Sequence, residues 1–288
     1  LHYPLRRQRQ MCIRDRLTAV VGMLLAVPGM VPLDILLFGN LGIGLCAASA
    51  AVINHVVDKK IDLLMKRTVN RPVAQGRLKD RHALLFSAAM GLMGMWVLIF
   101  HVNELTAWLT LGSLVGYALI YTCFLKRATP QNIVIGGLAG AAPPLLGWTA
   151  VTNEIHGHAL LLVLIIFAWT PPHFWALAVH RKDEYAKADI PMLPVTHGEK
   201  YTKIHIFLYT LILLVVSVMP FLTGMLGWLY LLGALSLGIG FIFWSVIMLY
   251  SEGGDSGMKT FNYSIVYLIS LFCIMLLDHY AITSSNPF

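Results

Sequence analysis

Charged residues are scarce in this chain. Asp, Glu, Lys and Arg together make up 12% of its 288 residues, while 58% are hydrophobic. Soluble domains carry roughly 25% charged residues, and a single soluble core cannot bury such an apolar excess. The expected environment is therefore a lipid bilayer. The net charge of +7 could indicate a nucleic-acid partner in a soluble protein, but the placement of the charges, described below, indicates membrane topology instead, so we expect no nucleic acid.

Cysteine is also rare, which argues against two further classes of protein. The four cysteines show no CxxC pair and no metal-ligand spacing: Cys12, Cys46, Cys123 and Cys273. A disulfide-stapled fold and a thiolate metal site are both disfavoured by this pattern. Residues 1–16 lack any long apolar run and hold five arginines, so they do not read as a signal peptide. We expect a basic tail at 1–16, cytoplasmic or foreign to the fold, then a transmembrane domain at 17–282 and a short tail at 283–288.

Long, continuous apolar runs predict transmembrane helices. A helix needs about 20 apolar residues to cross the hydrocarbon core, and uninterrupted rather than alternating runs exclude barrel strands. The sequence predicts an all-α bundle of about nine spans, of which the first is short: 17–29, 34–57, 82–101, 104–125, 132–151, 158–179, 204–223, 226–250 and 262–282.

The basic residues fix the predicted orientation. With the N-terminus inside, all 21 lysines and arginines fall in the inside segments, and the outside face carries only acids. This distribution follows the positive-inside rule. Two inside loops, 58–81 and 180–203, are long, and each follows a helix that ends in carboxylates. Four helices separate them, which suggests two four-helix halves plus a ninth helix.

The first loop opens with Asn54, Asp58 and Asp62. A spacing of four residues places these oxygen-bearing side chains along one face of a helix. Two acids one turn apart repel each other, and a divalent cation would turn that repulsion into binding. Magnesium suits this site, because it prefers oxygen ligands and often takes one or two carboxylates plus substrate phosphate.

Basic residues follow these acids and could neutralise phosphate oxygens: Lys66, Arg67 and Arg71. The alternative interpretation is a solvated, positive-inside loop with two incidental aspartates.

A second polar region ends the sixth predicted helix. Pro171 and Pro172 interrupt an apolar run just before His173 and Trp175. Prolines free backbone groups and kink a helix, which a membrane protein tolerates only where protein or a water-filled cavity satisfies those groups. His173 taken alone is better interpreted as a satisfied core histidine.

The same helix ends in a charged stretch: Arg181, Lys182, Asp183, Glu184 and Tyr185. An ordinary polar helix end would look the same. The matching positions of the two acid pairs in the two halves favour a shared function. A third segment, 136–148, is rich in small residues and contains two prolines, which predicts close helix packing or a bundle widened for a bulky substrate.

These motifs resemble a known family. The pattern N-x-x-x-D-x-x-x-D followed by R-T-x-x-R-P, from Asn54 to Pro72, resembles the first aspartate-rich motif of the intramembrane prenyltransferases. The patterns P-H-F-W-x-L-A and K-D-E-Y-x-x-A-x-I-P-M-L-P, with G-A-A-P-P-L-L-G-W, are similar to the protoheme IX farnesyltransferases, the heme O synthase family. The resemblance runs from about residue 17 to the last helix. Before it, the family's usual Lys-Pro-Arg entry is replaced by RQRQMCIRDR.

The resemblance implies a nine-helix bundle with a central cavity open near the inner face. Its substrates would be farnesyl diphosphate and heme b, with Mg²⁺ as cofactor. The implied metal ligands are Asn54, Asp58, Asp62, Asp183 and Glu184. The implied catalytic residues are Asp58, Asp62, Arg67, Arg71 and His173. The implied substrate-binding residues are Asn54, Lys66, Trp175, Arg181, Lys182 and Tyr185.

Two other functions fit parts of the sequence. One is a prenyltransferase for an aromatic quinone precursor, although those enzymes usually carry D-x-x-x-D in the second motif. The other is a membrane carrier of heme or lipid, since intramembrane prolines and paired halves also occur in transporters. We expect a bacterial cytoplasmic membrane rather than a mitochondrial inner membrane, with the active site near the cytoplasmic face. A downstream heme-modifying enzyme or terminal oxidase is a plausible partner.

Overall fold

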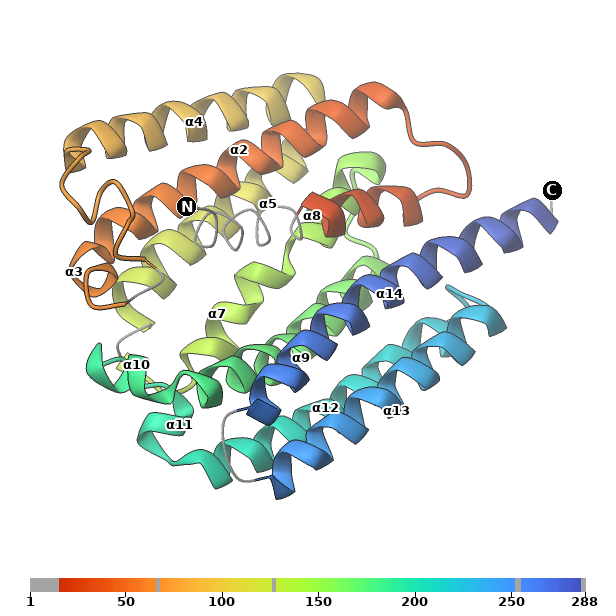
Figure 1. Cartoon of the computed structure of the whole chain (residues 1–288). Helices are drawn as coiled ribbons and strands as arrows, with labels where there is room; N and C mark the ends of the chain where they lie inside the picture. Colours follow the sequence, from red (N-terminus) through yellow and green to blue (C-terminus); the bar gives the residue numbers. More distant parts are fainter. Residues whose placement is uncertain (1–15, 66–67, 126–127, 252–254, 286–288) are drawn as a thin grey trace. The chain divides into compact units, whose positions relative to one another are not determined.

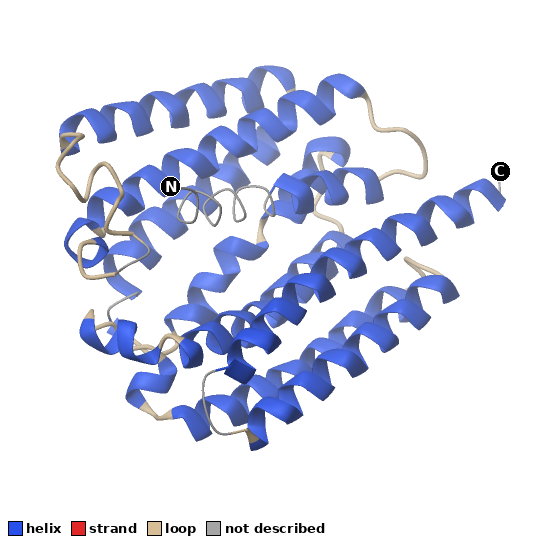
Figure 2. Ribbon diagram, in the orientation of Figure 1, coloured by secondary structure: helices blue, strands red, loops and turns tan. Residues whose placement is uncertain are grey.

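The computed structural model describes residues 16–65, 68–125, 128–251 and 255–285, and these form helices and connecting turns (Figures 1 and 2). A short helix, Arg16–Leu25, comes first. The elements after it are α2 (Leu33–Val57), α3 (Lys59–Asp62), α4 (Asp80–His101), α5 (Glu104–Val115), η1 (Gly116–Leu125), α7 (Asn132–Ala141), α8 (Pro143–Thr152), α9 (Gly157–His180), α10 (Lys182–Lys187), α11 (Leu193–Thr196), α12 (Glu199–Leu222), α13 (Trp228–Tyr250) and α14 (Asp255–Ser285).

Eight stretches of the described chain are long and apolar enough to cross a membrane. Together with the short first helix they confirm the predicted all-α membrane bundle of about nine helices. Two helices begin more than one turn earlier than predicted, α12 at Glu199 and α14 at Asp255. Their first turns are polar, so an apolar window misses them. Gly198, with a φ of 83°, adopts a left-handed conformation directly before α12 and so sets its start.

Two predicted spans are each divided in the structure. The span 104–125 continues from α5 into the π-helical segment η1, where the Thr122 hydroxyl donates to the carbonyl of Tyr117, five residues earlier. The span 132–151 is divided between α7 and α8 at Pro143, which has no N–H to continue the first helix. The two halves of that span belong to different compact units.

The chain forms two compact units. Unit 1 contains Leu1–Ala128, Ala142–Ile155 and Lys187–Ile190, and unit 2 contains Thr129–Ala141, His156–Ala186 and Pro191–Phe288. In unit 1, α2 and α4 lie side by side (Figure 1). Ser49 Oγ donates to the Ser87 carbonyl at 2.8 Å, and Ser87 Oγ donates to the Ser49 carbonyl at 2.9 Å. Small polar residues that exchange hydrogen bonds in this way hold transmembrane helices together.

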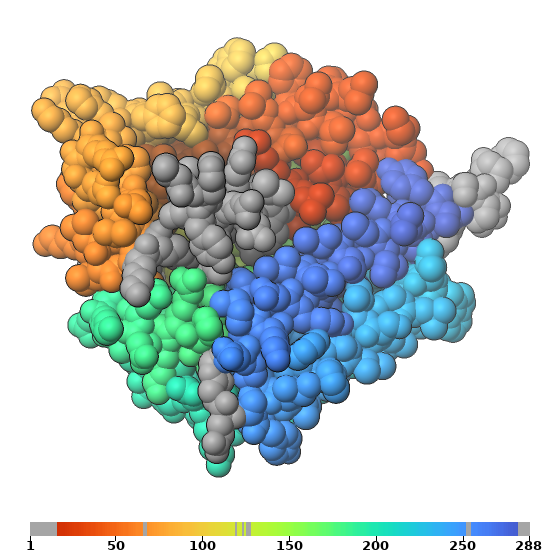
Figure 3. All heavy atoms as spheres, in the orientation of Figure 1, coloured from red at the N-terminus to blue at the C-terminus, as the bar shows by residue number. Residues whose placement is uncertain are grey.

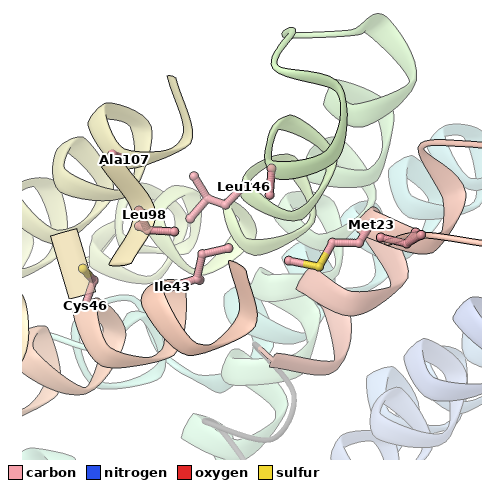
Figure 4. Close-up of a cluster of buried hydrophobic side chains, with 8 residues drawn as sticks. Met23, Ile43, Cys46, Leu98, Ala107 and Leu146 are labelled. Carbon is pink, nitrogen blue, oxygen red and sulfur yellow. The ribbon is translucent and has the colours of Figure 1, made fainter. Parts of the chain in front are cut away.

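An apolar cluster in unit 1 joins the short first helix to its neighbours. Figure 4 shows Met23 of the short helix, Ile43 and Cys46 of α2, Leu98 of α4 and Leu146 of α8, all buried in one cluster. The short helix lies close to α8, because a Cβ atom added at Gly22 would collide with the Pro144 carbonyl oxygen. An added Cβ at Gly147 would likewise collide with the Ala19 carbonyl oxygen. The small residues predicted to allow close packing therefore do so here.

Unit 2 is built around α9, which packs against α7, α12 and α14. The Trp169 indole on α9 donates to the Ser264 carbonyl on α14 at 2.8 Å. At the other end of α14, the buried Asp278 carboxylate accepts from the backbone N–H groups of Gly227 and Tyr230 and so caps α13. α13 and α14 also lie beside each other in the space-filling view (Figure 3).

Large apolar side chains cover much of the outer surface. α13 alone exposes Leu229, Leu232, Ile239 and Phe243, each more than half accessible. A soluble monomer rarely exposes contiguous apolar patches of this extent. These faces are suited to contact with lipid, and the chain is an integral membrane protein.

Candidate functional site

The first motif lies in unit 1, where α2 gives way to α3. Asp58 caps the end of α2, and its N–H donates to the Asn54 carbonyl at 2.9 Å. The Asp62 N–H donates to the Asp58 carbonyl at 2.8 Å, so the helical path continues through the cap. The side chains of Asn54, Asp58 and Asp62 thus keep the helical spacing predicted from the sequence. Asp58 and Asp62 are only 1% and 3% exposed, whereas incidental aspartates in a solvated loop would be accessible to water.

The loop after α3 folds back onto Asp62. Arg71 Nη1 donates to both carboxylate oxygens of Asp62, at 2.9 and 2.7 Å. Thr68 Oγ1 donates to the Asp62 carbonyl at 3.0 Å. These contacts give Asp62 a defined orientation and place a guanidinium directly beside the acidic pair. Lys66 and Arg67 lie outside the described residues.

The electrostatics of Asp62 are set by opposing causes. Burial raises the pKa of its carboxyl above the ordinary value, while the hydrogen bonds and positive charge of Arg71 act to lower it. The neighbouring Asp58 carboxylate adds to the upward shift. Two ionised carboxylates at this spacing repel each other. A divalent cation bound by both would relieve that repulsion.

The donors at this site match a hard cation. Asn54 Oδ1 is buried and has no hydrogen-bond partner among the described residues. That amide oxygen and the two carboxylates are the ligand type that Mg²⁺ prefers. Within each unit, the described chain has no group of three His, Cys, Asp or Glu side chains that could hold a metal alone. A metal in unit 1 would therefore rely on the amide oxygen, water or substrate oxygens to complete its coordination.

The second motif lies in unit 2. α9 runs through Pro171 and Pro172 to His180 without ending at either proline. His173 is 6% exposed and stacks between Trp169 and Phe261, with ring centroids 4.1 and 4.5 Å away. Its Nδ1 lies 2.6 Å from Ser264 Oγ. The interpretation of His173 as a satisfied core histidine fits this packing directly.

The tautomer of His173 follows from the next hydrogen bond. Ser264 Oγ donates its proton to the Phe261 carbonyl at 2.6 Å, so it accepts from His173. His173 therefore carries its proton on Nδ1. Ser264 lies 91 residues from His173 in the sequence, and nothing in the sequence pattern pairs them.

The charged stretch that follows α9 and continues into α10 forms ion pairs within unit 2. Arg181 Nη1 lies 3.7 Å from Glu184 Oε2, and Lys182 Nζ lies 3.2 Å from Glu199 Oε1. Tyr185 is buried, whereas Asp183 is exposed. Glu199, at the start of α12, was not among the predicted site residues. Its acidic side chain, 17 residues after a lysine, carries no spacing signal that could have identified it.

Comparisons with known proteins cover nearly the whole chain. The profile of the UbiA prenyltransferase family matches residues 17–272. A protoheme IX farnesyltransferase of Saccharophagus degradans is 68% identical over 93% of this chain and 89% of its own length. One from Teredinibacter turnerae is 64% identical over 92% of this chain and 85% of its own.

Solved structures with the same fold are more distant in sequence. A structure of digeranylgeranylglyceryl phosphate synthase has a TM-score of 0.80 at 18% identity, covering 94% of each chain. A UbiA homolog from Archaeoglobus fulgidus, bound to DMAPP and Mg²⁺, has a TM-score of 0.65 at 16% identity and covers 94% of this chain and 97% of its own. The family match and the two relatives above 60% identity agree, and the chain belongs to the UbiA prenyltransferase family.

Proposed function

We propose that this prenyltransferase transfers the farnesyl group of farnesyl diphosphate to the 2-vinyl group of heme b, giving heme O. The observation that carries this proposal is the 68% identity to a protoheme IX farnesyltransferase over nearly the whole chain. The buried acidic pair of unit 1 supplies the matching chemistry, because prenyl transfer requires a site for a diphosphate and its counter-cation. The proposed location is a bacterial cytoplasmic membrane, with the site near the cytoplasmic face, where all the lysines and arginines lie in the predicted topology.

The residues that would hold Mg²⁺ are Asn54, Asp58 and Asp62. Support comes from their buried oxygen atoms and from the orphaned amide oxygen of Asn54. When bound, Mg²⁺ neutralises charge on the departing diphosphate. Asp183 and Glu184 are proposed as further ligands, and variants at each position test this separately from unit 1.

Cationic side chains would offset the part of the diphosphate charge that Mg²⁺ does not neutralise. Arg71 is already beside Asp62, so its remaining guanidinium N–H groups are the proposed donors to phosphate oxygens. Lys182 and Arg181 are proposed for the same task, with Glu199 and Glu184 as their partners in the absence of substrate. Lys66 and Arg67 are proposed to bind the diphosphate as well, and Asn54, Trp175 and Tyr185 to contact substrate.

The bond changes follow from the two substrates. The allylic C–O bond breaks and its electron pair leaves with diphosphate. The vinyl group then attacks the farnesyl cation, and water adds to the resulting carbocation with loss of a proton, giving a hydroxyethylfarnesyl substituent. His173 and Trp175 are proposed to orient the heme side. For His173 the Nδ1–H tautomer leaves Nε2 as the acceptor edge of the ring.

Diphosphate release tests this function. Purified protein in nanodiscs is supplied with farnesyl diphosphate and Mg²⁺, together with heme b, with an aromatic quinone precursor, or with no acceptor. We expect release that depends on heme b and is lost with a chelator. Release that depends only on the aromatic precursor would reassign the acceptor. Movement of heme across vesicles without any diphosphate release would make the protein a carrier.

A further inference from the structure

A cluster of aromatic and imidazole rings lies in unit 2, between α9 and the first half of α12. We call its four members the α12 ring cluster: Tyr201, His205, Trp175 and Tyr209. The Tyr201 and His205 rings are 4.1 Å apart between centroids, and Trp175 makes edge contacts with His205 and Tyr209 at 6.3 and 5.4 Å. Residues four apart share one face of a helix, so α12 presents its three members as a single row.

His205 has a defined tautomer. Its Nδ1 lies 2.9 Å from the Tyr201 carbonyl oxygen. A carbonyl can only accept, so Nδ1 carries the proton and Nε2 carries the lone pair. A ring N–H held by a backbone carbonyl is the arrangement that metal-ligating histidines use. His205 also lies within the candidate membrane-spanning helix α12, Glu199–Leu222, where an ionisable side chain indicates function.

Trp175 adds an independent observation. Its ring is fully buried, yet Nε1 has no hydrogen-bond partner among the described residues. A buried donor without an acceptor costs about 1–3 kcal/mol, so an acceptor oxygen brought by a ligand would be stabilising. The cluster thus combines an imidazole lone pair, flat aromatic surfaces and one unmet N–H donor.

These features select one class of ligand. The iron of a heme is often held by an axial histidine nitrogen. The flat porphyrin ring suits aromatic surfaces, and its carboxylate side chains accept from N–H donors. A phosphate or an anionic lipid headgroup would use neither the imidazole lone pair nor the aromatic surfaces. Lys203, two residues before His205 on α12, donates to the Ser251 carbonyl at 2.8 Å.

We infer that the α12 ring cluster binds heme, with His205 Nε2 as an axial ligand of the iron and the Trp175 N–H as a donor to a heme carboxylate. The inference rests on the proposed function, since it adds a binding site for the same acceptor. It concerns residues outside the acidic motif, and binding is measurable without turnover.

The test is the visible absorption and EPR spectrum of heme b added to the purified protein in nanodiscs, without farnesyl diphosphate. The wild type should show a histidine-ligated spectrum. His205→Ala should lose that spectrum and weaken heme binding by about tenfold or more. Added imidazole should restore the spectrum to His205→Ala, which a variant with a merely disturbed fold would not allow. Trp175→Phe should keep the spectrum and bind heme more weakly.

The control is His82→Ala, an exposed histidine near the start of α4 in unit 1. It should leave the spectrum unchanged. If His205→Ala keeps the wild-type spectrum, or if His82→Ala alone removes it, the assignment to His205 is overturned while heme farnesylation stands. If the wild type produces heme O without any histidine-ligated heme spectrum, the site is again rejected and the function is retained. If it neither binds nor farnesylates heme, both are rejected.

Discussion

Arg71 and Asp62 form a salt bridge in which one guanidinium nitrogen, Nη1, donates to both carboxylate oxygens, at 2.9 and 2.7 Å. The side chains are 17% and 4% exposed, so the pair is largely withdrawn from water. It ties the loop after α3 to the end of the acidic motif. The same contact therefore serves the fold of the loop and the orientation of a proposed metal ligand.

Removing the guanidinium should destabilise unit 1. Arg71→Ala leaves the Asp62 carboxylate buried without its cation, which typically costs about 3–5 kcal/mol. The measurement is the unfolding free energy in detergent. Lys59→Ala is the matched control, because Lys59 pairs with Asp80 at 2.9 Å but both side chains are well exposed. That loss should be at most about 1 kcal/mol. Equal losses for the two variants would contradict the structural role of the buried pair.

Neutralising either acid of the first motif should abolish prenyl transfer. Asp58→Asn and Asp62→Asn keep the side-chain shape but remove the charge that a hard cation requires. Diphosphate release should fall to background at saturating Mg²⁺, with the protein still inserted in the membrane. Asp80→Asn is the control in the same basic loop, since its side chain is 48% exposed and pairs with Lys59. A near-normal rate for Asp58→Asn would remove that residue from the metal site.

The close approach of the short first helix and α8 should tolerate no added methyl group. Gly147→Ala would push a Cβ into the Ala19 carbonyl oxygen, and overpacking of this kind costs about 1–3 kcal/mol. Thermal unfolding in detergent measures the loss. Gly29→Ala is the control, because an added Cβ there meets nothing within 4 Å. A stability for Gly147→Ala equal to that of Gly29→Ala would show that the two helices do not pack as described.

The orientation in the membrane can be tested by labelling single cysteines. In a cysteine-free background, Lys60→Cys and Glu154→Cys place thiols at two exposed positions. The first lies in a basic segment and the second in an acidic one, so an impermeant reagent should label only Glu154→Cys in intact cells. Labelling of Lys60→Cys under those conditions would reverse the predicted topology and move the proposed site to the outer face.

Features that depend on a local sequence pattern could be predicted from the sequence. The spans are visible because a bilayer demands long apolar helices, and Asn54, Asp58 and Asp62 share a face because a helix repeats every 3.6 residues. The residues at which helices begin were harder to predict. α12 begins at Glu199 because of the left-handed Gly198, and its polar first turn lies outside any apolar window.

Contacts between distant segments could not be predicted in this way. Arg71 was expected to meet substrate phosphate, but no pattern showed that it would bind Asp62 through a folded-back loop. The Ser264 hydroxyl that fixes the tautomer of His173 comes from another helix, α14. Such pairs depend on how helices pack rather than on spacing along one helix.

The most direct test of heme farnesylation is the mass of the heme recovered after turnover. Wild-type protein in nanodiscs is incubated with heme b, farnesyl diphosphate and Mg²⁺, and the extracted heme is analysed by chromatography and mass spectrometry. The predicted product is heme b enlarged by one farnesyl group and one hydroxyl group, absent from the Asp58→Asn reaction. Recovery of unchanged heme b from folded protein that prenylates an aromatic quinone precursor would contradict the proposal.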